Sequence, residues 1–236
     1  MFTTRTDQSN TRFLSLRIAL SFRGLRFAVR KQHNDALTNW ILASLLDLID
    51  GIAARRLGQC SSFGILLDVI ADNVLRSIVW IATISEACRE EQISSPDEAM
   101  TEVCIYSAIV ILEWVTFVSS QATQTSHWKK EMETEPPAVV RSVFKNGFRN
   151  PAGFLAVYGL FVAPLGSFVW HSARQGGSTW VNEMLPGWFV VVLIYLSYVG
   201  RGLSAVVELW MCCNFLGVVI SADEAGRGDN EKKRSQ

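Results

Sequence analysis

Apolar stretches of membrane-spanning length alternate with short polar loops along this chain. An α-helix needs about 20 predominantly apolar residues to cross a bilayer. Five segments approach that length: roughly 37–53, 64–84, 103–119, 153–171 and 186–211. Gly200, Arg201 and Gly202 interrupt the last of them. The pattern therefore predicts an all-α, polytopic membrane protein.

A sixth stretch, residues 13–29, mixes apolar residues with arginines. At about 100° per residue, one face of a helix there gathers Arg12, Arg23, Arg26 and Arg30. Such a helix fits the surface of an anionic membrane. A helix that spans the bilayer, with its arginines facing protein or reaching the interface, fits equally well. The sequence predicts about six transmembrane helices and leaves the first one open between these alternatives.

Positive charge gathers in three polar segments, which together hold eleven Lys and Arg: 55–63, 122–150 and 221–236. The loops that would lie on the other side of the membrane carry only Arg89 and Arg174. The positive-inside rule then places the three segments in the cytosol. We divide the chain into an N-terminal segment (1–12), a transmembrane domain (13–220) and a tail (221–236). The tail is charged and contains glycine, which predicts disorder.

Composition narrows the classes of protein that fit. The chain has 236 residues, of which 49% are hydrophobic, and a formal net charge of zero, so no overall field favours nucleic acid as a partner. Its five cysteines lack the spacing of a zinc site or a secreted disulfide framework. Arg5, Arg12 and Arg17 precede any clean apolar core, so no cleaved signal peptide is predicted.

Four aspartates lie at facing ends of two neighbouring apolar segments. Asp47 and Asp50 are three residues apart near the end of one, and Asp68 and Asp72 are four apart near the start of the next. Each pair therefore shares one face of a helix. If the two helices fold back across the short loop between them, the four carboxylates meet near the cytosolic surface.

Four carboxylates in apolar helices repel one another unless positive charge lies between them. The nearby sequence offers Arg55, Arg56 and Arg76. Hard divalent cations with oxygen ligands, Mg²⁺ or Mn²⁺, match the carboxylates better. No His or Cys shares these faces, which disfavours zinc. An interface-facing position at a helix end would explain one such aspartate, but not four on two matched faces.

The segment 47–72 resembles the signature of the CDP-alcohol phosphotransferases, D-x2-D-G-x2-A-R-x8-G-x3-D-x3-D. Every fixed position matches: Asp47, Asp50, Gly51, Ala54, Arg55, Gly64, Asp68 and Asp72. The resemblance implies a fold of six transmembrane helices, usually a homodimer, with two Mg²⁺ or Mn²⁺ ions. It implies that the four aspartates bind these ions and that Asp72 is also the general base.

The same resemblance places Gly51, Ala54 and Gly64 beside the CDP group. Arg55 would then lie near its phosphates or orient the carboxylates. Small residues also let helices pack closely in a membrane, so either role explains the three of them. The implied reaction transfers a phosphatidyl group from CDP-diacylglycerol to an alcohol and releases CMP. An integral membrane enzyme of the endoplasmic reticulum, with its active site facing the cytosol, is the expectation.

Weaker likenesses favour myo-inositol as the alcohol. Gln59, Phe63 and Leu67, together with the tripeptide Ser126-His127-Trp128, resemble features of eukaryotic phosphatidylinositol synthases. Asn73 departs from that pattern, because those enzymes usually have arginine there, and Thr123 stands where an acidic residue is expected. Glycerol phosphate, serine, and the choline and ethanolamine types remain alternatives, as does a non-catalytic membrane relative.

Three residues outside the signature are candidates for contact with the acceptor or a phosphate: His127, Lys145 and Arg149. Each of them also fits an ordinary solvated loop residue on the cytosolic side.

Overall fold

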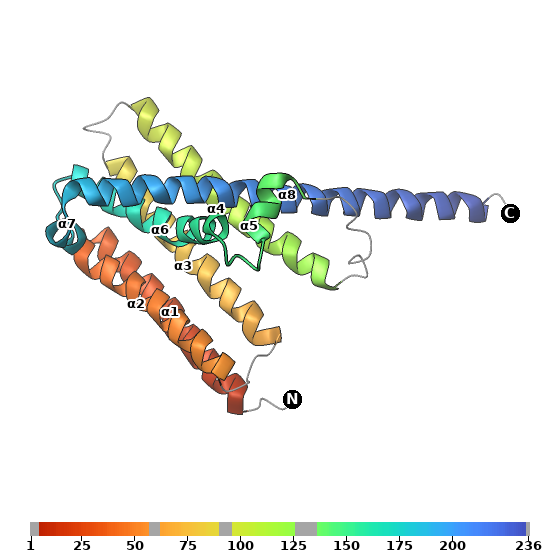
Figure 1. Cartoon of the computed structure of the whole chain (residues 1–236), viewed down its shortest axis with the longest axis horizontal. Helices are drawn as coiled ribbons and strands as arrows, with labels where there is room; N and C mark the ends of the chain where they lie inside the picture. Colours follow the sequence, from red (N-terminus) through yellow and green to blue (C-terminus); the bar gives the residue numbers. More distant parts are fainter. Residues whose placement is uncertain (1–4, 57–61, 90–95, 126–135, 235–236) are drawn as a thin grey trace. The chain divides into compact units, whose positions relative to one another are not determined.

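A computed structural model describes residues 5–56, 62–89, 96–125 and 136–234. Within these ranges the chain forms eight helices and no strand (Figure 1). They are α1 (Arg5–Val29), α2 (His33–Arg56), α3 (Ser62–Arg89), α4 (Pro96–Thr125), α5 (Ala138–Phe144), α6 (Pro151–Arg174), α7 (Trp180–Met184) and α8 (Gly187–Arg234). The all-α prediction is confirmed.

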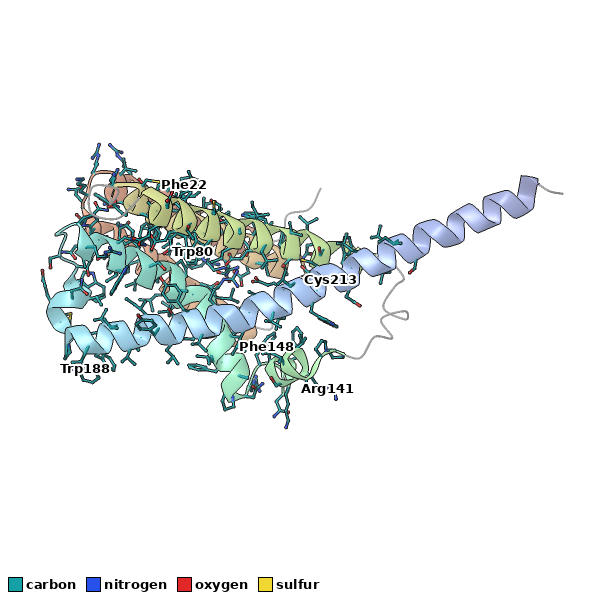
Figure 2. The ribbon with its side chains drawn as sticks, turned by 90° about the horizontal axis from the view of Figure 1, so that it is seen from above. Phe22, Trp80, Arg141, Phe148, Trp188 and Cys213 are labelled. Carbon is teal, nitrogen blue, oxygen red and sulfur yellow. The ribbon has the colours of Figure 1, made fainter. Side chains whose placement is uncertain are left out.

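Each apolar segment predicted to span a membrane lies within one helix: α2, α3, α4, α6 or α8. Among the described residues, three stretches are long and apolar enough to cross a bilayer: Asp97–Gln121, Pro151–Arg174 and Gly187–Ser221. Large apolar side chains such as Phe22 and Trp188 are exposed on the outside of their helices (Figure 2), as expected of side chains that face lipid. These features indicate a membrane protein, and the total number of spans stays a prediction.

Three elements differ from the sequence prediction. The short helices α5 and α7 were not predicted, because their few residues show no helical period. α8 continues as helix to Arg234, through most of the tail for which composition predicts disorder. A helix that is already formed extends without new nucleation. Ala, Glu, Lys and Arg of the tail favour this extension, whereas Gly226 and Gly228 each oppose it by about 1 kcal/mol.

The described chain divides into two compact units. The first unit comprises Met1–Val110 and Leu160–Ser197, and the second unit comprises Ile111–Gly159 and Tyr198–Gln236.

The core of the first unit joins α1, α2 and α3 around Trp40. Figure 1 shows α1 and α2 side by side, and their contact is close because Gly24 leaves room for the indole of Trp40. A Cβ atom on Gly24 would lie 2.3 Å from Trp40 Nε1. The same nitrogen donates a hydrogen bond to the carbonyl oxygen of Ser21 at 3.1 Å, and Leu75 and Val79 of α3 complete the cluster. These contacts fix the position of α1 along α2.

The second unit packs α5 against parts of α6 and α8. Val140, Val143, Ala156 and Val207 form its buried apolar cluster. Within this unit, the backbones of α6 and α8 touch, because a Cβ atom on Gly159 would lie 2.1 Å from the backbone nitrogen of Arg201. Small residues at such a crossing let two membrane helices pack closely.

Candidate active site

Three of the four aspartates of the signature meet at one side chain, Arg17 of α1. Arg17 Nη1 lies 2.7 Å from Asp47 Oδ1 and donates to Asp68 Oδ1 at 2.8 Å. Arg17 Nη2 donates to Asp72 Oδ1 at 2.5 Å. Asp47 belongs to α2, whereas Asp68 and Asp72 belong to α3. One guanidinium group therefore connects three helices of the first unit through charge-assisted hydrogen bonds.

The packing of α1 explains why Arg17 reaches the aspartates. Ser21 and Gly24 follow Arg17 by four and seven residues, so the three share one helical face. Asp47 follows Trp40 by seven residues on α2, again on one face. Since α1 and α2 are joined where Gly24 and Ser21 contact Trp40, the pairing of Arg17 with Asp47 lies two turns further along the same contact.

The guanidinium of this cluster is buried, whereas its carboxylates are partly exposed to solvent. The side chain of Arg17 is 3% exposed. Those of Asp47, Asp68 and Asp72 are 29%, 46% and 22% exposed. The carboxylates can therefore be reached by an ion or a phosphate group from outside the protein, although the guanidinium cannot.

Arg17 was not among the cations that sequence reasoning placed near the aspartates. Arg12, Arg23, Arg26 and Arg30 drew attention because they share a face, and the structure exposes the last three of them. Arg17 lies on the other face of α1, with Ser21 and Gly24. It therefore faces protein, and the structure leaves open whether the helix spans the membrane or lies on it. The small residues at that spacing were the available signal.

Arg76, one turn after Asp72 on α3, has a different environment from Arg17. Its Nη2 donates to the side-chain oxygen of Asn73, and its guanidinium lies 5.3 Å from the centre of the Phe161 ring. Asn73 is buried, and its hydrogen bond orients Arg76. Asn73 is also the residue that departs from the pattern of the phosphatidylinositol synthases.

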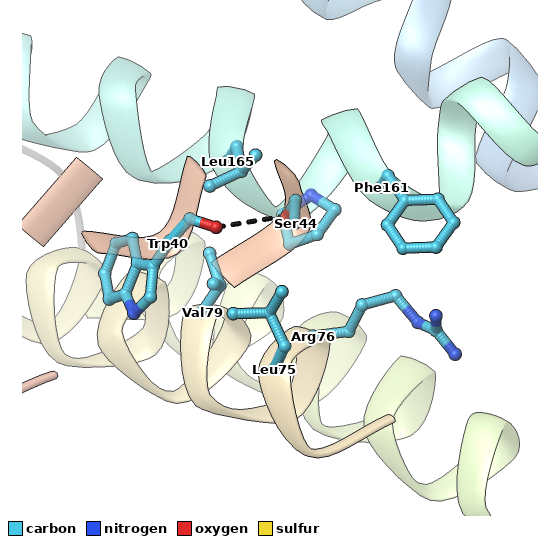
Figure 3. Close-up of a pocket in the computed structure, with 8 residues that line it drawn as sticks. Trp40, Ser44, Leu75, Arg76, Val79, Phe161 and Leu165 are labelled. Atoms are coloured by element: carbon cyan, nitrogen blue, oxygen red, sulfur yellow. Dashed lines mark hydrogen bonds between the residues drawn. The ribbon is translucent and has the colours of Figure 1, made fainter. Parts of the chain in front are cut away.

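A small pocket of the first unit lies beside Arg76. Figure 3 shows the residues that line it: Trp40, Ser44, Leu75, Arg76, Val79, Phe161, Pro164 and Leu165. Its volume of about 10 Å³ is close to the least that one water molecule needs. This pocket is therefore too small for a lipid substrate.

The remaining predicted site residues are described to different extents. Asp50, Gly51, Ala54 and Arg55 belong to the last turns of α2, and their side chains lie outside the described part of the structure. Gly64 is half-buried in the first turn of α3.

None of the candidates outside the signature lies among the described residues of the first unit. His127 lies outside the described residues. Lys145 and Arg149 are exposed in the second unit, at the connection between α5 and α6. Their proposed contacts with an acceptor or phosphate stay predictions.

The aspartates suit a divalent ion in their chemistry. Asp47 and Asp68 both contact the same nitrogen of Arg17, so their oxygens are close neighbours. Carboxylate oxygens are the ligands that Mg²⁺ and Mn²⁺ prefer. Among the described side chains, however, no group of three or more His, Cys, Asp or Glu has the arrangement of a metal cluster. The donor set fits a hard cation, and a guanidinium takes the position between the donors.

A second buried ion cluster belongs to the second unit. Arg201 Nη2 of α8 donates to Glu208 Oε2 at 2.9 Å and lies 3.3 Å from Glu113 Oε1 of α4. The side chains of Arg201, Glu113 and Glu208 are 4%, 1% and 10% exposed. Sequence reasoning missed this cluster, although single glutamates inside apolar segments were a signal for it.

One comparison with known proteins gave a match. A family model described as CDP-alcohol phosphatidyltransferase matches residues 12–144, which is more than half of the chain. The matched segment includes Arg17 and all four aspartates of the signature. No curated protein matches the chain, and no solved structure does.

Proposed function

The chain belongs to the CDP-alcohol phosphatidyltransferase family, and we propose that it transfers a phosphatidyl group from CDP-diacylglycerol to myo-inositol. Members of this family transfer a phosphatidyl group from a CDP-alcohol to an alcohol. The observation that carries the proposal is the meeting of Asp47, Asp68 and Asp72 at one cationic group, with their carboxylates open to the outside. Charge that can be reached by a phosphate-bearing substrate is what such a transfer requires.

Asp47, Asp50, Asp68 and Asp72 would hold the divalent ions, Mg²⁺ or Mn²⁺. When bound, two such ions neutralise the negative charge that grows on the leaving phosphate. The exposed edges of the carboxylates give ions a route to these oxygens. Gly51, Ala54 and Gly64 would leave room for the nucleotide, and Arg55 would contact its phosphates.

The transfer needs a base at the attacking alcohol. Asp72 would accept the hydroxyl proton of the alcohol as its oxygen attacks the phosphorus of the phosphatidyl group. A new phosphorus–oxygen bond forms to the alcohol, and the phosphorus–oxygen bond to CMP breaks. CMP leaves with the electron pair of that bond, and the product is a phosphodiester lipid. A positioned carboxylate can act in this way without an unusual proton affinity when the alcohol is held next to it.

The choice of myo-inositol rests on the residues that resemble phosphatidylinositol synthases, above all Ser126-His127-Trp128. His127, Lys145 and Arg149 would contact the acceptor or a lipid phosphate. The proposal includes a homodimer in the endoplasmic reticulum membrane with the site on the cytosolic side. Glycerol phosphate, serine, or a diacylglycerol acceptor with CDP-choline or CDP-ethanolamine are the same-family alternatives.

An assay with a panel of acceptors tests the proposal. Purified protein, CDP-diacylglycerol and Mn²⁺ are incubated with tritiated inositol, glycerol phosphate or serine in turn, and CMP release is measured. We expect release with inositol, loss of it in Asp68→Asn, and retention in Asp35→Asn, which changes an exposed aspartate of α2. Release with another alcohol alone would reassign the acceptor. No release with any alcohol or CDP-linked donor, from protein that unfolds cooperatively, would sink the enzyme proposal.

A further inference from the structure

The guanidinium of Arg17 occupies the point on which three aspartates converge. Two of them, Asp47 and Asp68, contact the same nitrogen, Nη1, and Asp72 accepts from Nη2. The side chain is 3% exposed, and within the described part of the chain its Nε has no hydrogen-bond partner. A buried charge of this kind is stable only because carboxylates face it.

A divalent ion and this guanidinium cannot share the same oxygens. Mg²⁺ binds carboxylate oxygens at about 2.0–2.1 Å. An ion bound to both Asp47 Oδ1 and Asp68 Oδ1 would lie beside Arg17 Nη1, which itself contacts these atoms at 2.7 and 2.8 Å. Two cations so close in a partly buried site repel each other strongly. One must move away before the other can bind at these atoms.

The way α1 is held makes a movement of the side chain cheaper than a movement of the helix. Trp40 fills the space beside Gly24 and donates to the carbonyl of Ser21, so α1 is anchored two turns from the cluster. The half-open carboxylates, by contrast, leave an approach for an ion from outside. Ion entry therefore has a route that does not require α1 to separate from α2.

We infer that Arg17 is a built-in counter-ion: it holds the carboxylates together in the ion-free protein and is displaced when a divalent cation binds. The inference rests on the proposed function, which supplies the need for the ion. Because Arg17 stabilises only the ion-free state, it lowers the apparent affinity of the site for Mg²⁺ or Mn²⁺. It thereby sets the ion concentration at which the site fills.

Equilibrium binding of Mn²⁺ tests this inference without any turnover. The full chain is purified in detergent, stripped of ions with EDTA and titrated with Mn²⁺, and free Mn²⁺ is followed by electron paramagnetic resonance. Arg17→Gln should bind Mn²⁺ at least about tenfold more tightly than the wild type, the factor expected from one lost charged hydrogen bond. Arg26→Gln, the same change at an exposed position of α1, should bind like the wild type.

Thermal unfolding, followed by tryptophan fluorescence, gives a second readout. In EDTA, Arg17→Gln should melt below the wild type, because the carboxylates then repel one another with less compensation. Saturating Mn²⁺ should restore its melting temperature to that of the Mn²⁺-bound wild type. If this variant does not fold without ions, Arg17→Lys serves in its place. Lysine keeps the charge but not the two-nitrogen fork, so its Mn²⁺ affinity should fall between the other two.

Several outcomes overturn the inference. Mn²⁺ binding to Arg17→Gln and Arg17→Lys that is no tighter than wild-type binding excludes competition by Arg17. Unchanged Mn²⁺ affinity together with weaker binding of CDP-diacylglycerol makes Arg17 a phosphate ligand instead. The proposed function can fail separately. If the Arg17 variants bind Mn²⁺ more tightly than the wild type, but the wild type releases CMP with no alcohol, the inference about Arg17 stands and the proposed enzyme activity does not.

Discussion

Arg17 in the first unit and Arg201 in the second unit are both buried arginines that face carboxylates, but their partners differ in exposure. The aspartates at Arg17 are 22–46% exposed, whereas the glutamates at Arg201 are 1% and 10% exposed. An ion or a phosphate can therefore reach the first set and not the second. The difference separates a cluster that can take part in chemistry from one that holds helices in place.

The two clusters also differ in how their charge can be balanced. One guanidinium faces three aspartates in the first unit and two glutamates in the second. Only the cluster at Arg17, whose carboxylates are partly exposed, can recruit further ions from solution. In the closed cluster, the pairing itself must stabilise each member, because a lone buried charge costs several kcal/mol. We therefore expect substitutions to affect turnover in the first case and stability in the second.

The largest effect is expected at the open cluster, from Asp72→Asn. Asparagine keeps the shape of the side chain but can neither accept the proton of the alcohol nor bind an ion as a carboxylate does. Turnover should fall by about 10⁴-fold, the upper end of the effect of a positioned base, while CDP-diacylglycerol still binds. CMP release measures the first and equilibrium binding the second, with Asp35→Asn as the control. An active Asp72→Asn enzyme would show that another group is the base.

At the buried cluster of Arg201, Glu113 and Glu208, Arg201→Leu should cost about 3–5 kcal/mol of unfolding free energy, because it leaves buried carboxylates without this cation. Chemical unfolding in detergent measures this loss. Mn²⁺ should not restore the stability, in contrast to Arg17→Gln, since the glutamates are closed to solvent. Recovery of stability with Mn²⁺ would mean that the second cluster is open and would remove the distinction between the two.

A triple replacement checks the interpretation of Arg201. Changing Arg201, Glu113 and Glu208 together to leucine removes all three charges and leaves apolar side chains in apolar surroundings. Such replacements of whole buried ion clusters are often neutral or stabilising. The triple variant should therefore be more stable than Arg201→Leu alone. If it is less stable, the cluster has packing contacts that leucine cannot replace.

Helical periodicity was enough to predict the fold class and the grouping of Asp47, Asp68 and Asp72. The apolar segments are local features, and residues three or four apart share a helical face whatever surrounds them. A single fold-back of α3 on α2 then brings Asp47 near Asp68 and Asp72. All of this depends on neighbouring parts of the sequence, and for that reason it could be read from the sequence.

The two arginines could not be placed in the same way. Arg17 meets Asp72 across 55 residues, and the meeting depends on how Trp40 fits against Gly24 when α1 docks. Arg201 meets Glu113 because two helices far apart in sequence are neighbours in the second unit. Periodicity tells which face of a helix is polar, but not which other helix that face will contact.

At the crossing of α6 and α8 beside Arg201, a substitution should cost less unfolding free energy than the loss of the Arg201 charge. A Cβ atom on Gly159 would lie 2.1 Å from the backbone nitrogen of Arg201, and backbone cannot move aside as a side chain can. Gly159→Ala should therefore cost about 2 kcal/mol of unfolding free energy, as overpacking usually does. Gly202→Ala is the matched control, because nothing lies within 4 Å of its Cβ position. Helix propensity favours alanine at that position by up to about 1 kcal/mol. Equal stability of the two variants in chemical unfolding would show that α6 and α8 separate easily there.

The smallest effect concerns Glu86, which tests whether exposure or membership of a unit decides the role of a carboxylate. Glu86 lies in the first unit, as the aspartates do, yet its side chain is only 1% exposed. We therefore expect it to act like the glutamates of the second unit, so that Glu86→Gln keeps turnover and loses stability. Burial alone would raise the pKa of Glu86, but His33 and Arg89 beside it outweigh burial and hold the pKa below its ordinary value of 4.5.

Because the pKa of Glu86 is lowered, the direction in which its contribution to stability changes with pH can be predicted and measured. Since ionised Glu86 is favoured by folding, its contribution to stability is complete above about pH 4.5 and is lost as the pH falls through the lower pKa of the folded protein. The difference in unfolding free energy between the wild type and Glu86→Gln should shrink on acidification; near neutral pH we expect about 1 kcal/mol, the difference between a charged and a neutral hydrogen bond. A Glu86→Gln protein that is stable at every pH but no longer releases CMP would make a closed carboxylate of the first unit essential to turnover. Exposure would then no longer distinguish the two clusters.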